Sequence, residues 1–216
     1  MMTPYDAVIF DLDGTLVDTE RLMFEAGETV FANHGGVLTH DLFGRILGTD
    51  GPTGRRILAE ALPDMDLAAL ERDWDAEIHL RFSQGIPARP GARALLQDLR
   101  ARGKPVAIAT SSGKPGATRK LESSGLTEFF EIIVTAEDVT HRKPAPDPYL
   151  LAAKRLGVDP ARCLAFEDSA PGTQSAHAAG MRVVLVPDMT TPAQDHAHHV
   201  AASLTEGARM AGLSDD

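Results

Sequence analysis

The sequence predicts an α/β fold: a doubly wound, Rossmann-like parallel sheet with a small α-helical domain inserted near its start. Three observations support this prediction: short apolar runs, amphipathic segments between them that end at glycine, and one long stretch without a strand pattern. Strands that alternate with helices imply right-handed crossovers between parallel strands. The chain has 216 residues, which fits one domain that carries an insertion.

Five short apolar runs, rich in β-branched residues, are the predicted strands. Their apolarity is continuous rather than alternating, which is typical of strands that are buried on both faces. The runs are 7–10, 106–109, 132–134, 163–166 and 183–186.

Three segments between these runs have apolar residues at helical spacing, and each is followed by a glycine that can end a helix. The segments are 91–102, 115–124 and 147–156. In the third segment we expect Leu150, Leu151 and Leu156 to face the core.

The stretch from 18 to 85 breaks this alternation, because it contains no convincing strand. Its clearest pattern is a single helical stripe made of Leu67, Leu70, Trp74, Ile78 and Phe82. The return path over 85–91 is rich in proline and glycine and is predicted to be a hinge. We therefore predict a core domain of residues 1–17 and 86–216 and a helical domain of residues 18–85.

Composition excludes several classes of protein. The formal net charge of −10 disfavours general binding to nucleic acid or to an anionic membrane. Cys163 is the single cysteine, so neither an intrachain disulfide nor a cysteine-based zinc site is expected. The start of the chain has no basic flank, and no apolar run reaches the roughly 18 residues of a membrane helix. We expect a cytoplasmic monomer.

Polar residues follow the predicted strands at the carboxyl edge, where open α/β sheets bind their ligands. Asp11 and Asp13 are the most informative pair, because strand alternation would place both on one side of the chain. Two carboxylates at such a short distance raise each other's pKa or require a cation. The further candidates at this edge are Thr15, Thr110, Ser111, Ser112, Lys143, Glu167 and Asp168.

These residues lie in four ordered motifs that resemble those of the haloacid dehalogenase superfamily of phosphohydrolases. The motifs are FDLDGTL at 10–16, TSS at 110–112, KPAPD at 143–147 and EDSAPG at 167–172. The segment after the first motif resembles the small α-helical cap of this family. The branch with the greatest resemblance holds sugar-phosphate phosphatases, β-phosphoglucomutase and pseudouridine 5′-phosphatase.

The resemblance implies a role for each matching residue. Asp11 is the expected nucleophile, Asp13 the general acid and base, and Lys143 the third catalytic residue. Thr15 is expected to hold Asp13 or to contact the substrate. Phosphate would be bound by Thr110, Ser111 or Ser112, and the order of importance among these three stays open.

The same resemblance implies a Mg²⁺ site. Its expected ligands are the Asp11 carboxylate, the Asp13 backbone carbonyl and Asp168, with Glu167 acting through water. The charges of these residues also point to a cation, because two unit charges about 4 Å apart interact by roughly 4 kcal/mol at an effective dielectric constant near 20. Carboxylates beside a phosphate dianion therefore require a divalent cation, and oxygen ligands favour Mg²⁺.

The predicted function is Mg²⁺-dependent hydrolysis of a small phosphorylated metabolite, a sugar phosphate or a nucleoside phosphate, through an aspartyl-phosphate. One alternative is a phosphomutase like β-phosphoglucomutase, but the histidine typical of mutases is replaced by Met23 or Phe24. Asp13 argues against dehalogenation. A signalling receiver domain is a further alternative, which the helical insertion disfavours.

Substrate contacts in the helical domain are harder to assign. Glu20 and the glycine-rich loop at 47–54 are candidates, together with Arg55 and Arg56. A histidine cluster in the segment 196–199 suggests either a metal site or an exposed segment, and we expect the exposed segment.

Overall fold

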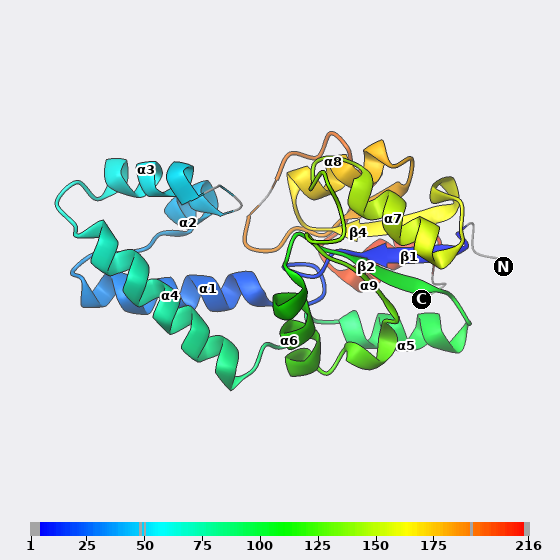
Figure 1. Cartoon of the computed structure of the whole chain (residues 1–216), viewed down its shortest axis with the longest axis horizontal. Helices are drawn as coiled ribbons and strands as arrows, with labels where there is room; N and C mark the ends of the chain where they lie inside the picture. Colours follow the sequence, from blue (N-terminus) through cyan, green and yellow to red (C-terminus); the bar gives the residue numbers. More distant parts are fainter. Residues whose placement is uncertain (1–4, 48, 50, 191, 214–216) are drawn as a thin grey trace. The chain divides into compact units, whose positions relative to one another are not determined.

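The computed structural model describes residues 5–47, 49, 51–190 and 192–213. The chain divides into two compact units (Figure 1). One comprises Met1–Asp18 together with Pro87–Asp216, and the other comprises Thr19–Ile86. We call the first the sheet unit and the second the helical unit.

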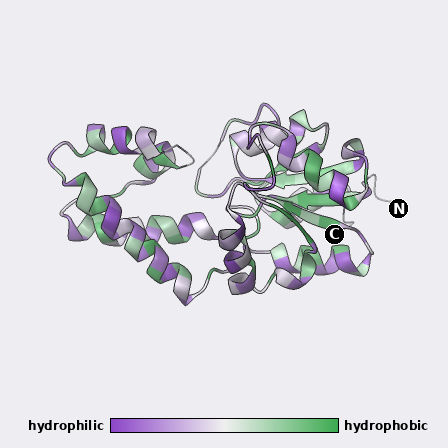
Figure 2. Cartoon of the chain, viewed as in Figure 1, coloured by the Kyte–Doolittle hydropathy of each residue, from purple (hydrophilic) through white to green (hydrophobic). Residues whose placement is uncertain are grey.

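The sheet unit contains a six-stranded parallel sheet with the strand order β3-β2-β1-β4-β5-β6. The strands are β1 (Ala7–Phe10), β2 (Val106–Ala109), β3 (Ile132–Val134), β4 (Cys163–Glu167), β5 (Arg182–Leu185) and β6 (His199–Val200). The central strands are apolar along their length (Figure 2). The predicted α/β fold with a parallel sheet is confirmed, and the short β6 is an addition that the sequence did not indicate.

Helices cover both faces of this sheet (Figure 1). One face carries α7 (Asp147–Leu156) and α8 (Ala170–Ala178), and the other carries α5 (Ala92–Ala101) and α9 (Leu204–Met210). The helix α6 (Lys114–Ser124) follows β2.

The inward face of α7 differs from the prediction. Tyr149, Ala152 and Ala153 are fully buried in the core, whereas Leu150 is 41% exposed. Helical geometry places residues three and four apart on one side, so the face that starts at Tyr149 turns Leu150 outward. The expectation that Leu150 faces the core is therefore wrong, whereas Leu151 and Leu156 do pack against it.

The helical unit consists of α1 (Thr19–Asn33), α2 (His40–Ile46), α3 (Gly51–Ala61) and α4 (Leu67–Gln84). Aromatic side chains form its centre, where the rings of Phe31 and Phe43 both contact Trp74. The indole N–H of Trp74 donates a hydrogen bond to the backbone carbonyl of Met23 at 3.0 Å, which fixes the ring. None of the described helices has the length and apolarity that a membrane crossing requires.

Candidate active site

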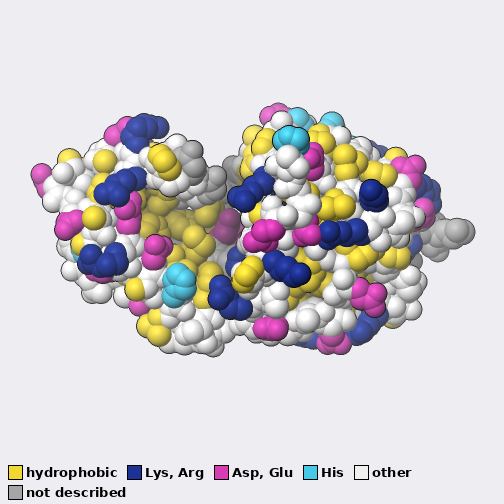
Figure 3. Space-filling view, viewed as in Figure 1, with side chains coloured by type: hydrophobic (Ala, Val, Ile, Leu, Met, Phe, Trp, Pro, Cys, Tyr) yellow, Lys and Arg dark blue, Asp and Glu magenta, His cyan; other side chains and the backbone are white. Residues whose placement is uncertain are grey.

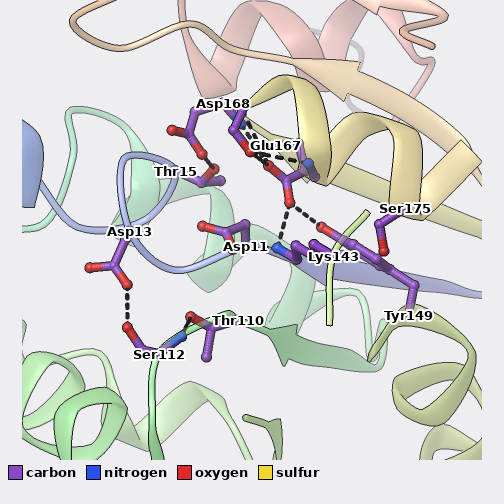
Figure 4. Close-up of polar contacts among 12 residues, drawn as sticks. Asp11, Asp13, Thr15, Thr110, Ser112, Lys143, Tyr149, Glu167, Asp168 and Ser175 are labelled. Atoms are coloured by element: carbon purple, nitrogen blue, oxygen red, sulfur yellow. Dashed lines mark hydrogen bonds and ion pairs between the residues drawn. The ribbon is translucent and has the colours of Figure 1, made fainter. Parts of the chain in front are cut away.

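Asp11 begins the loop at the carboxyl end of the central strand β1. Its backbone N–H donates to the carbonyl of Phe166 at 3.0 Å, so the pairing with β4 continues to this residue. The chain then turns at Gly14, whose φ of 73° is readily adopted by glycine. Because β1 ends at Phe10, strand alternation does not extend to Asp13, and the two carboxylates have different partners (Figure 4).

Lys143 connects the loop after β1 to the end of β4. Its ammonium lies 2.5 Å from Asp11 Oδ1 and 2.5 Å from Glu167 Oε1 (Figure 4). The side chain of Lys143 is 5% exposed, and Glu167 is fully buried. A buried cation that is shared by two carboxylates is held in one geometry, because leaving either charge unpaired is costly.

Glu167 is held by hydrogen bonds on both oxygens. Oε1 also accepts from the buried hydroxyl of Tyr149 at 2.8 Å. Oε2 accepts from the backbone N–H groups of Asp168 and Ser169 and from the Ser169 hydroxyl at 3.0 Å. Glu167 therefore positions Lys143, and both of its oxygens are already engaged by protein donors.

Burial and neighbouring charges shift the pKa values of these groups. Burial raises the pKa of Asp11 to about 8; Lys143 opposes this effect, while Glu167 and Asp13 add to it. Burial alone would lower the pKa of Lys143, but Asp11 and Glu167 outweigh it and raise the pKa. Burial also raises the pKa of Tyr149 well above its ordinary value, so the phenol remains a hydrogen-bond donor. Additional positive charge near Asp11 would favour its ionised form.

Three buried carboxylates converge at this point. Oxygens of Asp11, Glu167 and Asp168 lie within 4.8 Å of one another. Together with Lys143, the ionised groups carry a net charge of −2, which one divalent cation would balance. All the candidate ligand atoms are oxygens, which hard divalent cations prefer. The residues thus fit a divalent metal site.

Thr15 does not have the expected contact with Asp13. Its hydroxyl donates to Asp168 Oδ1 at 2.9 Å, and the residue is only 1% exposed. Thr15 therefore orients a candidate metal ligand instead of donating to Asp13 as predicted, and a contact between Thr15 and the substrate stays a prediction.

The loop after β2 contains the predicted phosphate ligands. Thr110 is buried, and its Oγ1 accepts from the backbone N–H of Ser112 at 3.0 Å. The Ser112 hydroxyl donates to Asp13 Oδ2 at 2.7 Å, whereas Ser111 is exposed. The structure thus brings Thr110, Ser112 and Asp13 together and leaves Ser111 at the surface.

Two polar residues at the site were not anticipated from the sequence. Tyr149 lies on the buried face of α7, and Lys120 lies on α6, 2.5 Å from Asp13 Oδ1. A signal for Lys120 exists, because it follows the buried Ala117 by three residues and precedes the buried Leu121. A lysine within an apolar helical stripe requires an acceptor.

The helical unit contains a cavity of about 790 Å³. Its walls are mainly apolar and include Met23, Phe43 and Trp74; Figure 3 shows hydrophobic side chains gathered in a hollow of this unit. Much of the predicted glycine-rich loop lines this cavity, whereas its residues 48 and 50 lie outside the described residues.

Two of the remaining candidates of the helical unit form ion pairs with residues of the same unit. Arg55 lies 3.1 Å from Glu71 at the cavity, and Arg56 lies 2.7 Å from Glu60. Glu20 lies in the first turn of α1. A role of these residues in substrate binding stays a prediction.

The histidine cluster includes a member from α8. The ring of His177 lies near those of His196 and His198, with centroids 5.3 and 5.6 Å apart. His198 Nδ1 accepts the backbone N–H of Val183 at 3.1 Å, which places the proton of a neutral ring on Nε2. This tautomer leaves His198 no free lone pair for a metal ion.

Comparison with known proteins relates the chain to one family. The sequence profile of the family described as haloacid dehalogenase-like hydrolase matches residues 8–186. A phosphorylated carbohydrates phosphatase of Thermotoga maritima is 37% identical over 177 residues, covering 82% of each chain. A fructose-1-phosphate phosphatase of Escherichia coli is 35% identical over 189 residues, covering 85% of this chain and 97% of the relative.

A solved structure extends the likeness over the whole fold. The crystal structure of a HAD family hydrolase from Deinococcus radiodurans, with bound phosphate and sodium, matches with a TM-score of 0.87. The two chains are 30% identical, and the match covers 99% of each. The chain therefore belongs to the haloacid dehalogenase-like hydrolase family and is a phosphoric monoester hydrolase.

Proposed function

We propose that this enzyme is a Mg²⁺-dependent phosphatase that hydrolyses small phosphomonoesters, sugar or nucleoside phosphates, through an aspartyl-phosphate on Asp11. The observation that carries the proposal is the pairing of Asp11 with Lys143 beside two further buried carboxylates. A buried carboxylate that faces fixed positive charge is suited to attack an electrophilic phosphorus.

In the first step, an Asp11 carboxylate oxygen forms a bond to phosphorus while the bond to the leaving oxygen breaks. Asp13 gives its proton to that oxygen, so the product leaves as a neutral alcohol. The Lys143 ammonium contributes positive charge next to the nucleophile. Thr110 and Ser112 bind the phosphoryl oxygens, and the partial positive charge at the N-terminus of α6 favours them there.

In the second step, water attacks the phosphorus of the aspartyl-phosphate and its proton passes to the Asp13 carboxylate. The bond between phosphorus and the Asp11 oxygen breaks, which releases inorganic phosphate and restores both carboxyl groups to their starting state. Asp13 thus acts once as an acid and once as a base.

Asp11, Asp168 and the backbone carbonyl of Asp13 would hold Mg²⁺, and the family resemblance implies that Glu167 acts through water. Both Glu167 oxygens already accept hydrogen bonds from the protein, which disfavours direct coordination. The cation, when bound, neutralises part of the negative charge of the carboxylates and the phosphate. Thr15 supports this arrangement by orienting Asp168.

We assign substrate selection to the helical unit, as the cap of the enzyme. Its cavity offers apolar walls with Arg55 and Glu71 among the lining residues, so it can distinguish leaving groups by shape and polarity. Phosphatases of carbohydrates among the relatives support sugar phosphates as one class to test.

The proposal is tested by phosphate release from 4-nitrophenyl phosphate and from a panel of sugar and nucleoside phosphates. Activity should require added Mg²⁺, stop in EDTA, and fall at least about 10³-fold in Asp11→Asn. Exposed Arg119→Met serves as a control that should keep full activity. Full activity of Asp11→Asn or of the EDTA-treated enzyme would contradict the proposal, and isomerisation of a sugar phosphate without phosphate release would indicate a mutase.

A further inference from the structure

Lys120 forms a three-way contact with the predicted general acid and the phosphate-binding loop. Its ammonium lies 2.5 Å from Asp13 Oδ1 and donates to Ser112 Oγ at 2.8 Å. The Ser112 hydroxyl in turn donates to Asp13 Oδ2 at 2.7 Å. Each oxygen of the Asp13 carboxylate therefore has its own donor, Lys120 for Oδ1 and Ser112 for Oδ2.

The number of donors at this contact limits what Ser112 can do. A serine hydroxyl has one proton to donate, and here Asp13 receives it. If Ser112 donates to a phosphoryl oxygen, as the proposed function expects, it must give up its bond to Asp13 Oδ2. An ammonium has three N–H donors, so Lys120 can keep its contact with Oδ1 during this exchange.

We propose that Lys120 is a positioning residue that anchors Oδ1 of Asp13, so that Oδ2, released by Ser112 when the phosphoryl group binds, transfers the proton. This inference rests on the proposed function, because it takes Asp13 as the general acid. Asp13 needs such an anchor, because its side chain is 31% exposed and lies beyond the end of β1, where an isolated bridge to Val17 pairs its backbone but does not fix the carboxylate. A general acid must lie within hydrogen-bond distance of the leaving oxygen.

The burial of Lys120 and its place on α6 support a specific contact with Asp13. Its side chain is 16% exposed, although lysine is normally a surface residue. It lies on the inward stripe of α6 between the buried Ala117 and Leu121, whereas the preceding Arg119 is exposed. Arg119 is therefore a matched control, because it is a cation on the same helix with its side chain in solvent.

The experiment measures kcat/KM of the wild type and of Lys120→Met with 2,4-dinitrophenyl, 4-nitrophenyl and phenyl phosphate. A dinitrophenolate leaves without a proton, whereas phenolate depends on the acid. Loss of positioning should therefore reduce kcat/KM at least about tenfold more for phenyl phosphate than for dinitrophenyl phosphate. Lys120→Arg should recover most of the difference, and Arg119→Met should match the wild type.

A double mutant and an inhibition constant complete the test. In an Asp13→Asn background, Lys120→Met should change kcat/KM by less than about twofold, because the positioned group is already absent. Inorganic phosphate should inhibit Lys120→Met and the wild type with similar constants.

An equal loss for all three esters, or a matching loss of phosphate affinity, would overturn the inference and make Lys120 a phosphate ligand or a structural residue. Unchanged kinetics would overturn it as well. The variant Asp11→Asn separates the two proposals. If hydrolysis is lost in this variant, the proposed function stands whatever Lys120→Met shows. If hydrolysis remains, both proposals fail.

Discussion

The carboxylate of Glu167 lies directly against the Cα of Gly172, in the first turn of α8, and leaves no room for a side chain there. A Cβ on residue 172 would overlap the carboxylate carbon and both oxygens of Glu167. That carboxylate cannot move aside cheaply, because it is fully buried and bonded to Lys143 and Tyr149. Glycine at this position thus sets the place of the carboxylate that holds Lys143.

We expect Gly172→Ala to displace Glu167 and with it Lys143. Overpacking of this kind costs about 1–3 kcal/mol of unfolding free energy, and the misplaced ammonium should lower kcat at least about tenfold. Urea denaturation and steady-state kinetics measure the two effects. Gly116→Ala is the control, because its Cβ would meet open space in a helix and should be neutral or stabilising. Equal behaviour of the two variants would show that Glu167 has room to move.

Tyr149→Phe removes the hydroxyl that donates to Glu167 Oε1 at 2.8 Å and leaves the ring in the core. One buried acceptor then loses a donor, so we expect the free energy of unfolding to fall by about 1–3 kcal/mol. Lys143 still holds the same oxygen, and kcat should fall less than in Gly172→Ala. Thermal unfolding and kinetics check this; a larger kinetic loss than in Gly172→Ala would indicate a direct role for the phenol.

Binding of a divalent cation should stabilise the folded protein. Mg²⁺ added to EDTA-treated enzyme should raise the unfolding midpoint in a concentration-dependent way, because the ion binds only where the carboxylates are assembled. Asp168→Asn removes one candidate ligand, so the same rise in the midpoint should require at least about ten times more Mg²⁺. Calorimetry at graded Mg²⁺ concentrations measures it. An unchanged midpoint in the wild type would contradict a metal site at Asp11 and Asp168.

Asp138 provides a pH-dependent contribution to stability away from the active site. Arg155 lies 2.6 Å away, and this contact, with hydrogen bonds from Thr135, lowers the pKa of Asp138 to about 2. A lowered folded-state pKa contributes stability that is complete above the ordinary value of 3.8 and is lost as pH falls toward about 2. Because both side chains are partly exposed, we expect Asp138→Asn to cost about 1 kcal/mol at pH 7.

Urea denaturation of the wild type and Asp138→Asn at pH 7 and at pH 3 checks this sign. The difference between the two proteins should narrow at the lower pH. A difference that grows on acidification would rule out the ionised carboxylate as its source.

The sequence predicts the fold, and it predicts that the candidate site residues gather at one sheet edge, because both follow from simple geometry. Carboxyl ends of parallel strands share one edge, so residues that follow β1, β2 and β4 had to meet there. The path of a loop and the rotation of a helix about its axis do not follow from sequence spacing in the same way. The structure was therefore needed to show that Lys143 reaches both Asp11 and Glu167.

The errors have the same origin. The family resemblance predicts that Thr15 holds Asp13, but the Thr15 hydroxyl, after the turn at Gly14, donates to Asp168, 153 residues away. Lys120 was overlooked because its partner Asp13 lies on a distant segment. Contacts of this kind depend on how helices pack on the sheet, and one sequence does not specify that packing residue by residue.

The most direct test of the account is to trap the phosphorylated enzyme. The wild type is mixed with Mg²⁺ and excess 4-nitrophenyl phosphate, quenched in acid, digested and examined by mass spectrometry. We predict one added phosphoryl group on the peptide that contains Asp11, and none in Asp11→Asn. Rapid hydrolysis without any phosphorylated peptide, or a phosphoryl group on another residue with Asp11→Asn still active, would contradict Asp11 as the nucleophile.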